Sequence, residues 1–139
     1  MKKRPLPASL NKVVNKDFDL QFRRHPSTGK LLMKKDDDTV KQALKNLILT
    51  DRYERPFRPN YGGDIRKRLF DLHTSVTKSD YENLIETAIK NYEPRALLDN
   101  SSISILEYPD DNGMIVNIRF KNQTTLNDLQ LDVNLNKVR

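Results

Sequence analysis

The sequence predicts an α+β fold: a single two-layer domain in which an N-terminal hairpin and helices precede a three-stranded antiparallel C-terminal sheet, packed on a long amphipathic helix. Two observations carry this prediction. Apolar residues recur at helical spacing up to residue 92, and from residue 103 onward they alternate with polar residues. The 139 residues suit one domain, so we expect a flexible basic arm over 1–16 and a single domain over 17–139.

Composition and charge narrow the classes of function. The chain has no cysteine, which excludes disulfides, and no apolar run near the roughly 20 residues of a membrane span, so we expect no membrane partner. The net charge of +6 is uneven, because residues 1–35 hold ten Lys or Arg and two Asp, a net charge of +8. Such a basic arm can bind nucleic acid or an acidic protein surface, but no interleaving of aromatic and basic residues supports nucleic acid.

A hairpin is predicted before the first helix. Phe18, Leu20 and Phe22 alternate with polar residues, which is typical of a half-buried strand. Turn residues at 25–29 then lead to a second short strand at Leu31–Met33. The apolar side chains of the first strand should therefore face the domain.

The first helix is expected over roughly 39–50, where apolar residues recur at helical spacing. Thr39 and Gln42 have the spacing of a capping box, and the three aspartates at 36–38 suit the positive end of the helix dipole. The aspartates also invite a metal interpretation. Consecutive acids point in different directions, however, and no calcium-loop glycine with a distal glutamate follows, so we expect no metal.

The segment 51–63 is expected to be a stiffened loop. It holds two prolines, two glycines and three arginines, and three aromatic residues that can anchor it to the domain: Tyr53, Phe57 and Tyr61. Asp64 is a candidate N-cap for a short helix at 65–72. Gly62 and Gly63 are not followed by the Lys of a phosphate-binding loop, so a tight entry to this helix is the preferred interpretation.

The strongest helical pattern covers 78–92, with Thr77 and Ser79 as competing N-caps and Pro94 as the stop. Its apolar stripe consists of Tyr81, Leu84, Ile85, Ala88, Ile89 and Tyr92. Alternating patterns then predict three strands, near 103–105, 114–120 and 129–135. A turn at 109–113 should join the first two of them.

Glu93, Pro94 and Arg95 close this helix and admit two interpretations. In the first, Pro94 only stops the helix, and Arg95 caps carbonyl groups or pairs with Glu93. In the second, Pro94 fixes an exposed corner for a partner, since the guanidinium is a rigid fork of donors that is enriched at binding hot spots. The residues alone favour the first interpretation.

Little in the sequence indicates catalysis. His25 and His73 are far apart without metal-ligand spacing, and there is no Gly-x-Ser-x-Gly elbow. Two carboxylates could support glycoside hydrolysis, with Glu93 as the natural general acid. The neighbouring Arg95 favours the ionised carboxylate, however, whereas a general acid must carry a proton. We therefore predict a protein that is not an enzyme and has no catalytic residue and no cofactor.

Two runs of residues resemble one known family. The runs Arg55–Asp64 and Ile89–Arg95, with a short helix after the first, resemble the small baseplate wedge proteins of contractile-tailed phages and their counterparts in type VI secretion baseplates. The resemblance covers roughly residues 39–139. It implies a structural subunit in the tail baseplate of a virion, assembled in the host cytoplasm. This family is sometimes labelled lysozyme-like, which would imply a muramidase instead.

The resemblance reverses the preference at the helix end. It implies that Glu93, Pro94 and Arg95 contact the helical core bundle that holds each baseplate wedge together. It also implies a platform on which the first ring of tail sheath subunits assembles, with a fold similar to the part of the sheath protein that exchanges strands. The expected partners are other wedge proteins and the tail sheath protein, with no small-molecule substrate.

Our hypothesis is that the last strand, or the edge beside it, templates the addition of sheath subunits. A free strand edge can accept a strand from another chain through main-chain hydrogen bonds. The predicted contact residues are Leu129, Leu131 and Val133. The alternative is an ordinary strand buried against the long helix. A competing interpretation of the whole chain is a basic-arm binding module for nucleic acid or an acidic protein surface.

Overall fold

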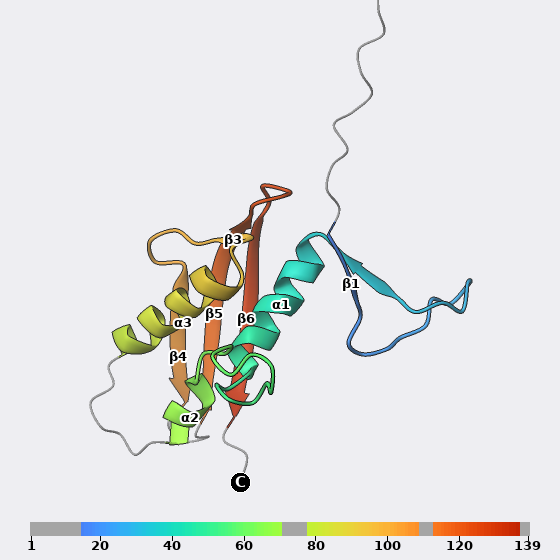
Figure 1. Ribbon diagram of the computed structural model, residues 1–139. Helices are drawn as coiled ribbons and strands as arrows, with labels where there is room; N and C mark the ends of the chain where they lie inside the picture. The colour runs from blue at the N-terminus through green and yellow to red at the C-terminus, as the bar shows by residue number, and fades with distance from the viewer. Residues whose placement is uncertain (1–14, 71–77, 109–112, 137–139) are drawn as a thin grey trace, which may run out of the picture.

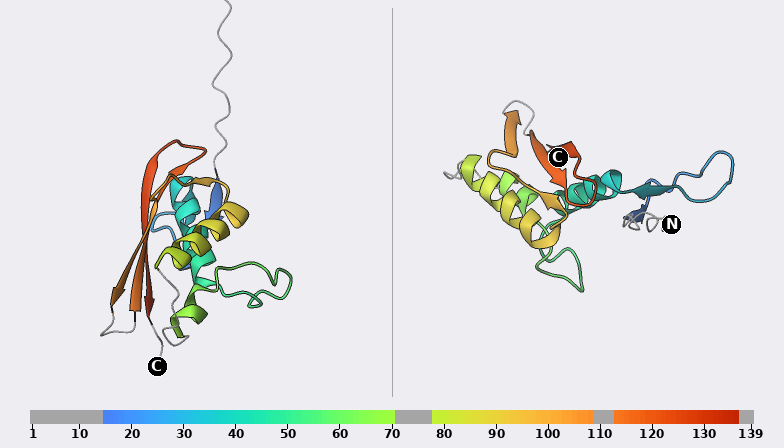
Figure 2. Two further views of the ribbon diagram at one scale, coloured as in Figure 1. Left: turned by 90° about the vertical axis from the view of Figure 1, so that its left-hand side faces the viewer. Right: turned by 90° about the horizontal axis from the view of Figure 1, so that it is seen from above.

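The computed structural model describes residues 15–70, 78–108 and 113–136. It contains a two-stranded sheet and a four-stranded sheet, and the helices all lie on one face of the larger sheet (Figures 1 and 2). No helix within these ranges is long and apolar enough to cross a membrane. The elements in chain order are β1 (Lys16–Phe18), β2 (Met33–Lys35), α1 (Asp37–Leu49), α2 (Ile65–Phe70), α3 (Lys78–Tyr92), β3 (Ala96–Leu97), β4 (Ile103–Tyr108), β5 (Gly113–Asn122) and β6 (Asp128–Asn136).

The larger sheet is built around β5, which pairs antiparallel with all three other strands. β6 runs along one side of β5 from Gly113 to Lys121, while β4 and then β3 occupy the other side. The predicted three-stranded sheet is therefore a four-stranded one. β3 was missed because two residues are too few to show a period of two; Ala96 pairs with Asn122 at the far end of β5.

The core lies between this sheet and the helices, as the predicted two-layer arrangement requires. Every second residue of β5 points into it and is buried: Met114, Val116, Ile118 and Phe120. α1 packs against β6, and α3 packs against β4. Each large apolar side chain buried in this way contributes about 1.5–3 kcal/mol to folding. The opposite face of the sheet carries exposed residues such as Leu106 and Arg119.

α3 confirms the predicted helix. Four residues of its stripe are buried, namely Tyr81, Ile85, Ala88 and Ile89. The last helical bond runs from the Glu93 N–H to the Ile89 carbonyl at 2.8 Å, after which Pro94 turns the chain toward β3. Ser79 lies inside the helix. Its rival cap Thr77 and most of the predicted turn at 109–113 lie outside the described residues.

The predicted capping box at the start of α1 is wrong. The helix begins at Asp37, and the hydroxyl of the buried Thr39 has no hydrogen-bond partner among the described residues. The Gln42 side chain reaches away from the helix start and donates to the Phe18 carbonyl at 2.9 Å. Contacts with distant residues therefore hold this helix end, in place of the local cap that the spacing suggested.

The N-terminal hairpin exists, but its predicted burial is wrong. β1 and β2 pair from Lys16–Lys35 to Phe18–Met33, and the hairpin projects away from the domain (Figure 1). The chain turns after Asp19, where the Phe22 N–H donates to the Asp19 carbonyl at 2.8 Å, so the strand alternation stops there. Phe18, Leu20 and Phe22 are all exposed, because no core lies beneath them. The predicted arm over 1–16 lies outside the described residues as far as residue 14.

Candidate partner-binding surfaces

The end of α3 forms a closed ion pair. The Glu93 side chain is buried, with the residue only 6% exposed. The Arg95 guanidinium donates hydrogen bonds to both oxygens of its carboxylate. Nε donates to Oε1 at 2.5 Å, and Nη2 donates to Oε2 at 2.8 Å. The hydrogen bond with Glu93 raises the pKa of Arg95. Within the isolated chain, Arg95 therefore pairs locally with Glu93, as in the first of the two interpretations of this tripeptide.

Glu93, Pro94 and Arg95 form a corner at the end of α3, and the ion pair determines which of their groups can face a partner. Pro94 is exposed and the Arg95 side chain is one-third exposed, whereas Glu93 lies beneath them. The guanidinium has five N–H donors, so several remain available after two bind Glu93. Its charge is already balanced by Glu93, so the remaining donors fit neutral main-chain carbonyls best. Both carboxylate oxygens of Glu93 accept hydrogen bonds from Arg95, so neither faces outward from this corner.

The loop over 51–63 packs beside this corner. The Tyr61 ring lies 5.2 Å from the Tyr92 ring, and the Tyr92 hydroxyl donates to the Asn60 carbonyl. The Arg55 guanidinium stacks over Tyr61, 4.0 Å from the ring centroid. The two runs that carry the family resemblance therefore form one continuous surface. Sequence reasoning assigned Tyr92 to the apolar stripe of α3 and missed this contact between distant segments.

The prediction that three aromatic residues anchor this loop is wrong for two of them. Phe57 is 98% exposed and Tyr53 is also exposed, so only Tyr61 packs against the domain. Main-chain bonds fix the loop instead, including the Tyr53 N–H to the Pro59 carbonyl at 2.7 Å. Asp64 precedes α2 as expected, but its carboxylate accepts the main-chain N–H of Arg52 at 2.8 Å. Asp64 thus closes the base of the loop.

β6 combines buried side chains with a free main-chain edge. Val133 is buried, while Leu129 and Leu131 are half-buried on the same inner face. The helix that covers them is α1, and the long helix α3 packs against β4 instead. Among the described strands, only β5 pairs with β6. Its outer edge is therefore open.

Hydrogen bonds identify which residues of β6 face this open edge. The Asn122 N–H donates to the Asn127 carbonyl at 3.0 Å, whereas the Arg119 N–H points the other way, to Ser102. Main-chain groups alternate in direction along an antiparallel strand. The main-chain groups of Leu129, Leu131 and Val133 therefore hydrogen-bond to β5. The residues between them, such as Asp132, direct their main-chain N–H and C=O groups to the open edge.

Asp37 ties the turn before β6 to the start of α1. Its carboxylate accepts hydrogen bonds from three side chains on one turn, at 2.5–2.8 Å: Asn122, Thr125 and Asn127. These bonds, that from Thr125 first, hold the pKa of Asp37 below its ordinary value of 3.8. Sequence reasoning assigned this aspartate only to the helix dipole, because nothing in the local pattern indicates partners almost ninety residues away.

Two solved structures share the fold. A Geobacter sulfurreducens protein named as a candidate tail lysozyme superposes with a TM-score of 0.68 at 20% identity, covering 79% of this chain and 98% of its own. A chain of the anti-feeding prophage baseplate gives a TM-score of 0.55 at 24% identity, covering 91% of this chain and 88% of its own. At these identities, the comparison establishes the fold alone: it is one found in components of tails and baseplates.

Sequence comparison then gives the family. Residues 34–126 match the family described as baseplate wedge protein gp25, and the chain belongs to this family of contractile-tail baseplate wedge proteins. The baseplate wedge protein gp25 of Enterobacteria phage T4 is 38% identical over 82 residues, which cover 59% of this chain. The chain spans about three-fifths of that relative, with 61% of its length matched. The matched range includes the corner at Pro94 and the loop over 51–63, and it ends before β6.

Proposed function

We propose that this chain is a structural wedge subunit that binds the wedge core bundle through the corner at Pro94 and Arg95, starts tail sheath assembly along β6, and catalyses no reaction. Membership of the baseplate wedge family supports the wedge role. The observation that carries the corner contact is the bidentate pair, in which Glu93 holds a partly exposed guanidinium in one orientation. A hydrolase would instead release soluble products from purified peptidoglycan.

The corner fits the end of a helix in the core bundle. The last carbonyls of a helix have no partner within it and carry partial negative charge. The free N–H donors of Arg95 are suited to such carbonyls, since the full charge of the guanidinium is already balanced by Glu93. A fixed guanidinium also loses little conformational freedom on binding. The adjacent loop, with the exposed Phe57, enlarges the surface available to the same partner.

Arg95→Lys should weaken binding to the core-bundle proteins at least about tenfold, the effect of losing a modest binding hot spot. Lysine keeps a cation beside Glu93, but its single amino group cannot bind both carboxylate oxygens and also direct donors toward a partner. We would measure retention of co-produced wedge proteins on the tagged chain. Arg95→Glu is less useful, because it would leave the buried Glu93 beside a second negative charge.

Arg119→Lys, on the open face of the sheet, is the matched control and should bind like the wild type. Thermal melting should confirm that both variants are folded. If Arg95→Lys and the wild type retain the wedge proteins equally, the corner acts only as a helix stop and not as a binding surface.

Asp132→Pro should abolish sheath polymerisation from the baseplate while leaving the chain folded. Asp132 directs its main-chain N–H to the open edge, so proline removes a donor that a sheath strand would use and no donor to β5. The readout is the length of sheath on purified baseplates. Asp132→Ala, which removes the same carboxylate but keeps the N–H, should assemble normally. Normal sheath on the proline variant would exclude templating at this edge.

A further inference from the structure

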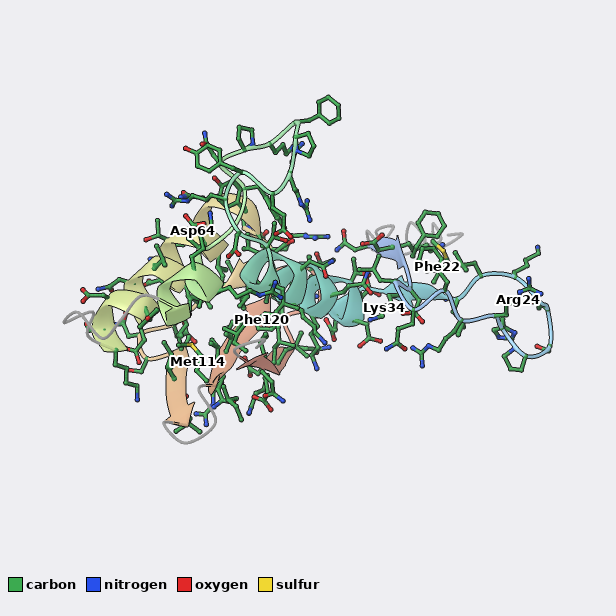
Figure 3. The ribbon with its side chains drawn as sticks, turned by 90° about the horizontal axis from the view of Figure 1, so that it is seen from below. Phe22, Arg24, Lys34, Asp64, Met114 and Phe120 are labelled. Atoms are coloured by element: carbon green, nitrogen blue, oxygen red, sulfur yellow. The ribbon has the colours of Figure 1, made fainter. Side chains whose placement is uncertain are left out.

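The projecting hairpin carries an unusual concentration of exposed apolar side chains. It contributes five of the eleven large hydrophobic residues that are exposed among the described residues: Phe18, Leu20, Phe22, Leu31 and Met33. Figure 3 shows Phe22 and Arg24 on the part of the hairpin that projects beyond the helices and the larger sheet, with Lys34 nearer to α1. Scattered exposed hydrophobic residues are ordinary, but a group on one projecting element marks an interaction site.

Three of these residues share one face of the hairpin. Phe18 lies directly opposite Met33. Leu31 lies two positions before Met33, just outside β2, where it forms a bridge with Arg24 across the hairpin, and the alternation of side chains places it on the same face. We call these three residues the hairpin patch; they are 56%, 41% and 37% exposed for Phe18, Met33 and Leu31. Cations border the patch on that face. Lys16 and Lys35 form the next cross-strand pair, and Arg24 lies opposite Leu31.

The two faces of the hairpin differ in how their charges are balanced. On the other face, Asp17 lies opposite Lys34, and the buried Asp19 accepts a hydrogen bond from Arg23 at 2.7 Å. None of the three cations around the hairpin patch forms an ion pair with a described residue. The cationic charge left unbalanced therefore gathers around the exposed apolar group.

The hairpin is also held in place at its base. The Gln42 side chain on α1 donates to the Phe18 carbonyl at 2.9 Å, and the Asp36 N–H donates to the Asn15 carbonyl at 2.7 Å. A surface fixed in this way is preorganised, so less ordering entropy is lost when a partner binds.

The energetics point to an acidic partner. Like charges directly opposite each other on paired strands are destabilising, as Lys16 and Lys35 are here, and a two-stranded hairpin alone is marginal in water. A carboxylate placed between the two lysines would remove the repulsion, and apolar contacts on the patch would add stability. The partner surface should therefore be an apolar groove with acidic residues at its rim.

We propose that the hairpin patch docks into such an acid-rimmed groove on another protein of the same particle. Phe and Met are enriched in the centres of protein interfaces, and charged residues belong to their rims, which is the arrangement here. Nucleic acid fits less well, because Leu31 and Met33 offer no ring on which a base can stack. The hairpin patch is separate from the corner and from β6. The docking proposal rests on the proposed function only in placing the partner in the baseplate.

Site-specific photocrosslinking in the assembled particle tests this proposal. Met33 is replaced by photoreactive p-benzoylphenylalanine in cells that produce the whole particle, and crosslinked peptides are identified by mass spectrometry after purification. We expect one dominant crosslink to a segment of another tail protein that is rich in Asp and Glu. The same replacement at Leu106, an exposed apolar residue on the open sheet face, should not give that crosslink.

Lys35→Glu separates docking from a merely structural role. The introduced carboxylate would pair with Lys16, so the hairpin itself should become more stable, whereas attraction to an acidic partner is reversed. We expect the Met33 crosslink to fall at least fivefold, and Lys45→Glu on the exposed side of α1 to leave it unchanged. An unchanged or stronger crosslink in Lys35→Glu would overturn the proposal.

Other outcomes also decide the question. Crosslinks to nucleic acid, to a second copy of this chain, or to no partner in a particle that contains the chain would each overturn the docking proposal alone. Absence of the chain from purified baseplates would overturn the proposed wedge function as well.

Discussion

Gly62→Ala should lower the free energy of unfolding by at least about 3 kcal/mol, a combined result of backbone strain and a steric clash. Gly62 has a φ of +123°, which residues with a side chain rarely adopt, and an added Cβ would lie 2.3 Å from the Thr50 carbonyl oxygen. That oxygen also accepts the Gly63 N–H at 3.2 Å, so the loop cannot move away without losing this bond. Denaturant unfolding of the purified chain measures the change.

Gly29 provides a matched control within the same chain. Its φ of +64° is also positive, but nothing lies within 4 Å of an added Cβ. Gly29→Ala should therefore cost only about 1 kcal/mol, the strain of the left-handed conformation without the clash. Similar losses in both variants would mean that the loop can yield at Gly62, and that its position beside Tyr92 is not fixed by this turn.

Local periodicity explains the parts of the fold that the sequence predicts well. The stripe of α3 and the alternation in β5 each face one large core, so position along the element determines burial. Where no core lies on the apolar side, the same signal misleads. Phe18, Leu20 and Phe22 alternate like a buried strand, yet the hairpin that carries them projects from the domain. Periodicity indicates which residues share a face only while the strand continues, and here the chain turns after Asp19, with no core to cover the exposed side chains.

The candidate site was also predictable from the sequence only in part. The pairing of Glu93 with Arg95 was one of two interpretations open from the sequence, because the residues are two positions apart on either side of a proline. The contact of Tyr61 with Tyr92 joins residues 31 positions apart, and no spacing rule predicts it. The binding roles of the corner and of Leu129, Leu131 and Val133 remain predictions that the experiments above test.

Asp37→Ala should destabilise the chain by about 3 kcal/mol at neutral pH. The substitution removes three hydrogen bonds to a carboxylate and leaves the amide of Asn122, which is fully buried, without its partner. A buried donor that loses its acceptor costs about 1–3 kcal/mol by itself, and the other two bonds add to this. Asp38→Ala is the matched control, since Asp38 is exposed in the same helical turn, and it should cost under about 0.5 kcal/mol.

The effect of Asp37→Ala should also depend on pH. Folding lowers the pKa of Asp37 below 3.8, so the folded state favours the ionised carboxylate. Its contribution to stability is fully present above about pH 5, and it is lost as pH falls through 3.8 and then through the lower folded-state pKa. The stability difference between wild type and Asp37→Ala should therefore shrink on acidification, in denaturant titrations between about pH 7 and pH 2.5. A difference that stays constant over this range would mean that shape, and not charge, holds the turn.

The same substitution connects stability to the proposed sheath contact. Asp37 bonds to the turn that leads directly into β6, so it fixes the end of the strand whose outer edge is open. Loss of these bonds should increase hydrogen exchange first at the main-chain amides of 123–128, before the centre of the sheet responds. If sheath assembly needs a rigid edge, Asp37→Ala should slow it even at temperatures where the chain remains folded. Normal assembly with a mobile turn would show that only the central part of β6 takes part.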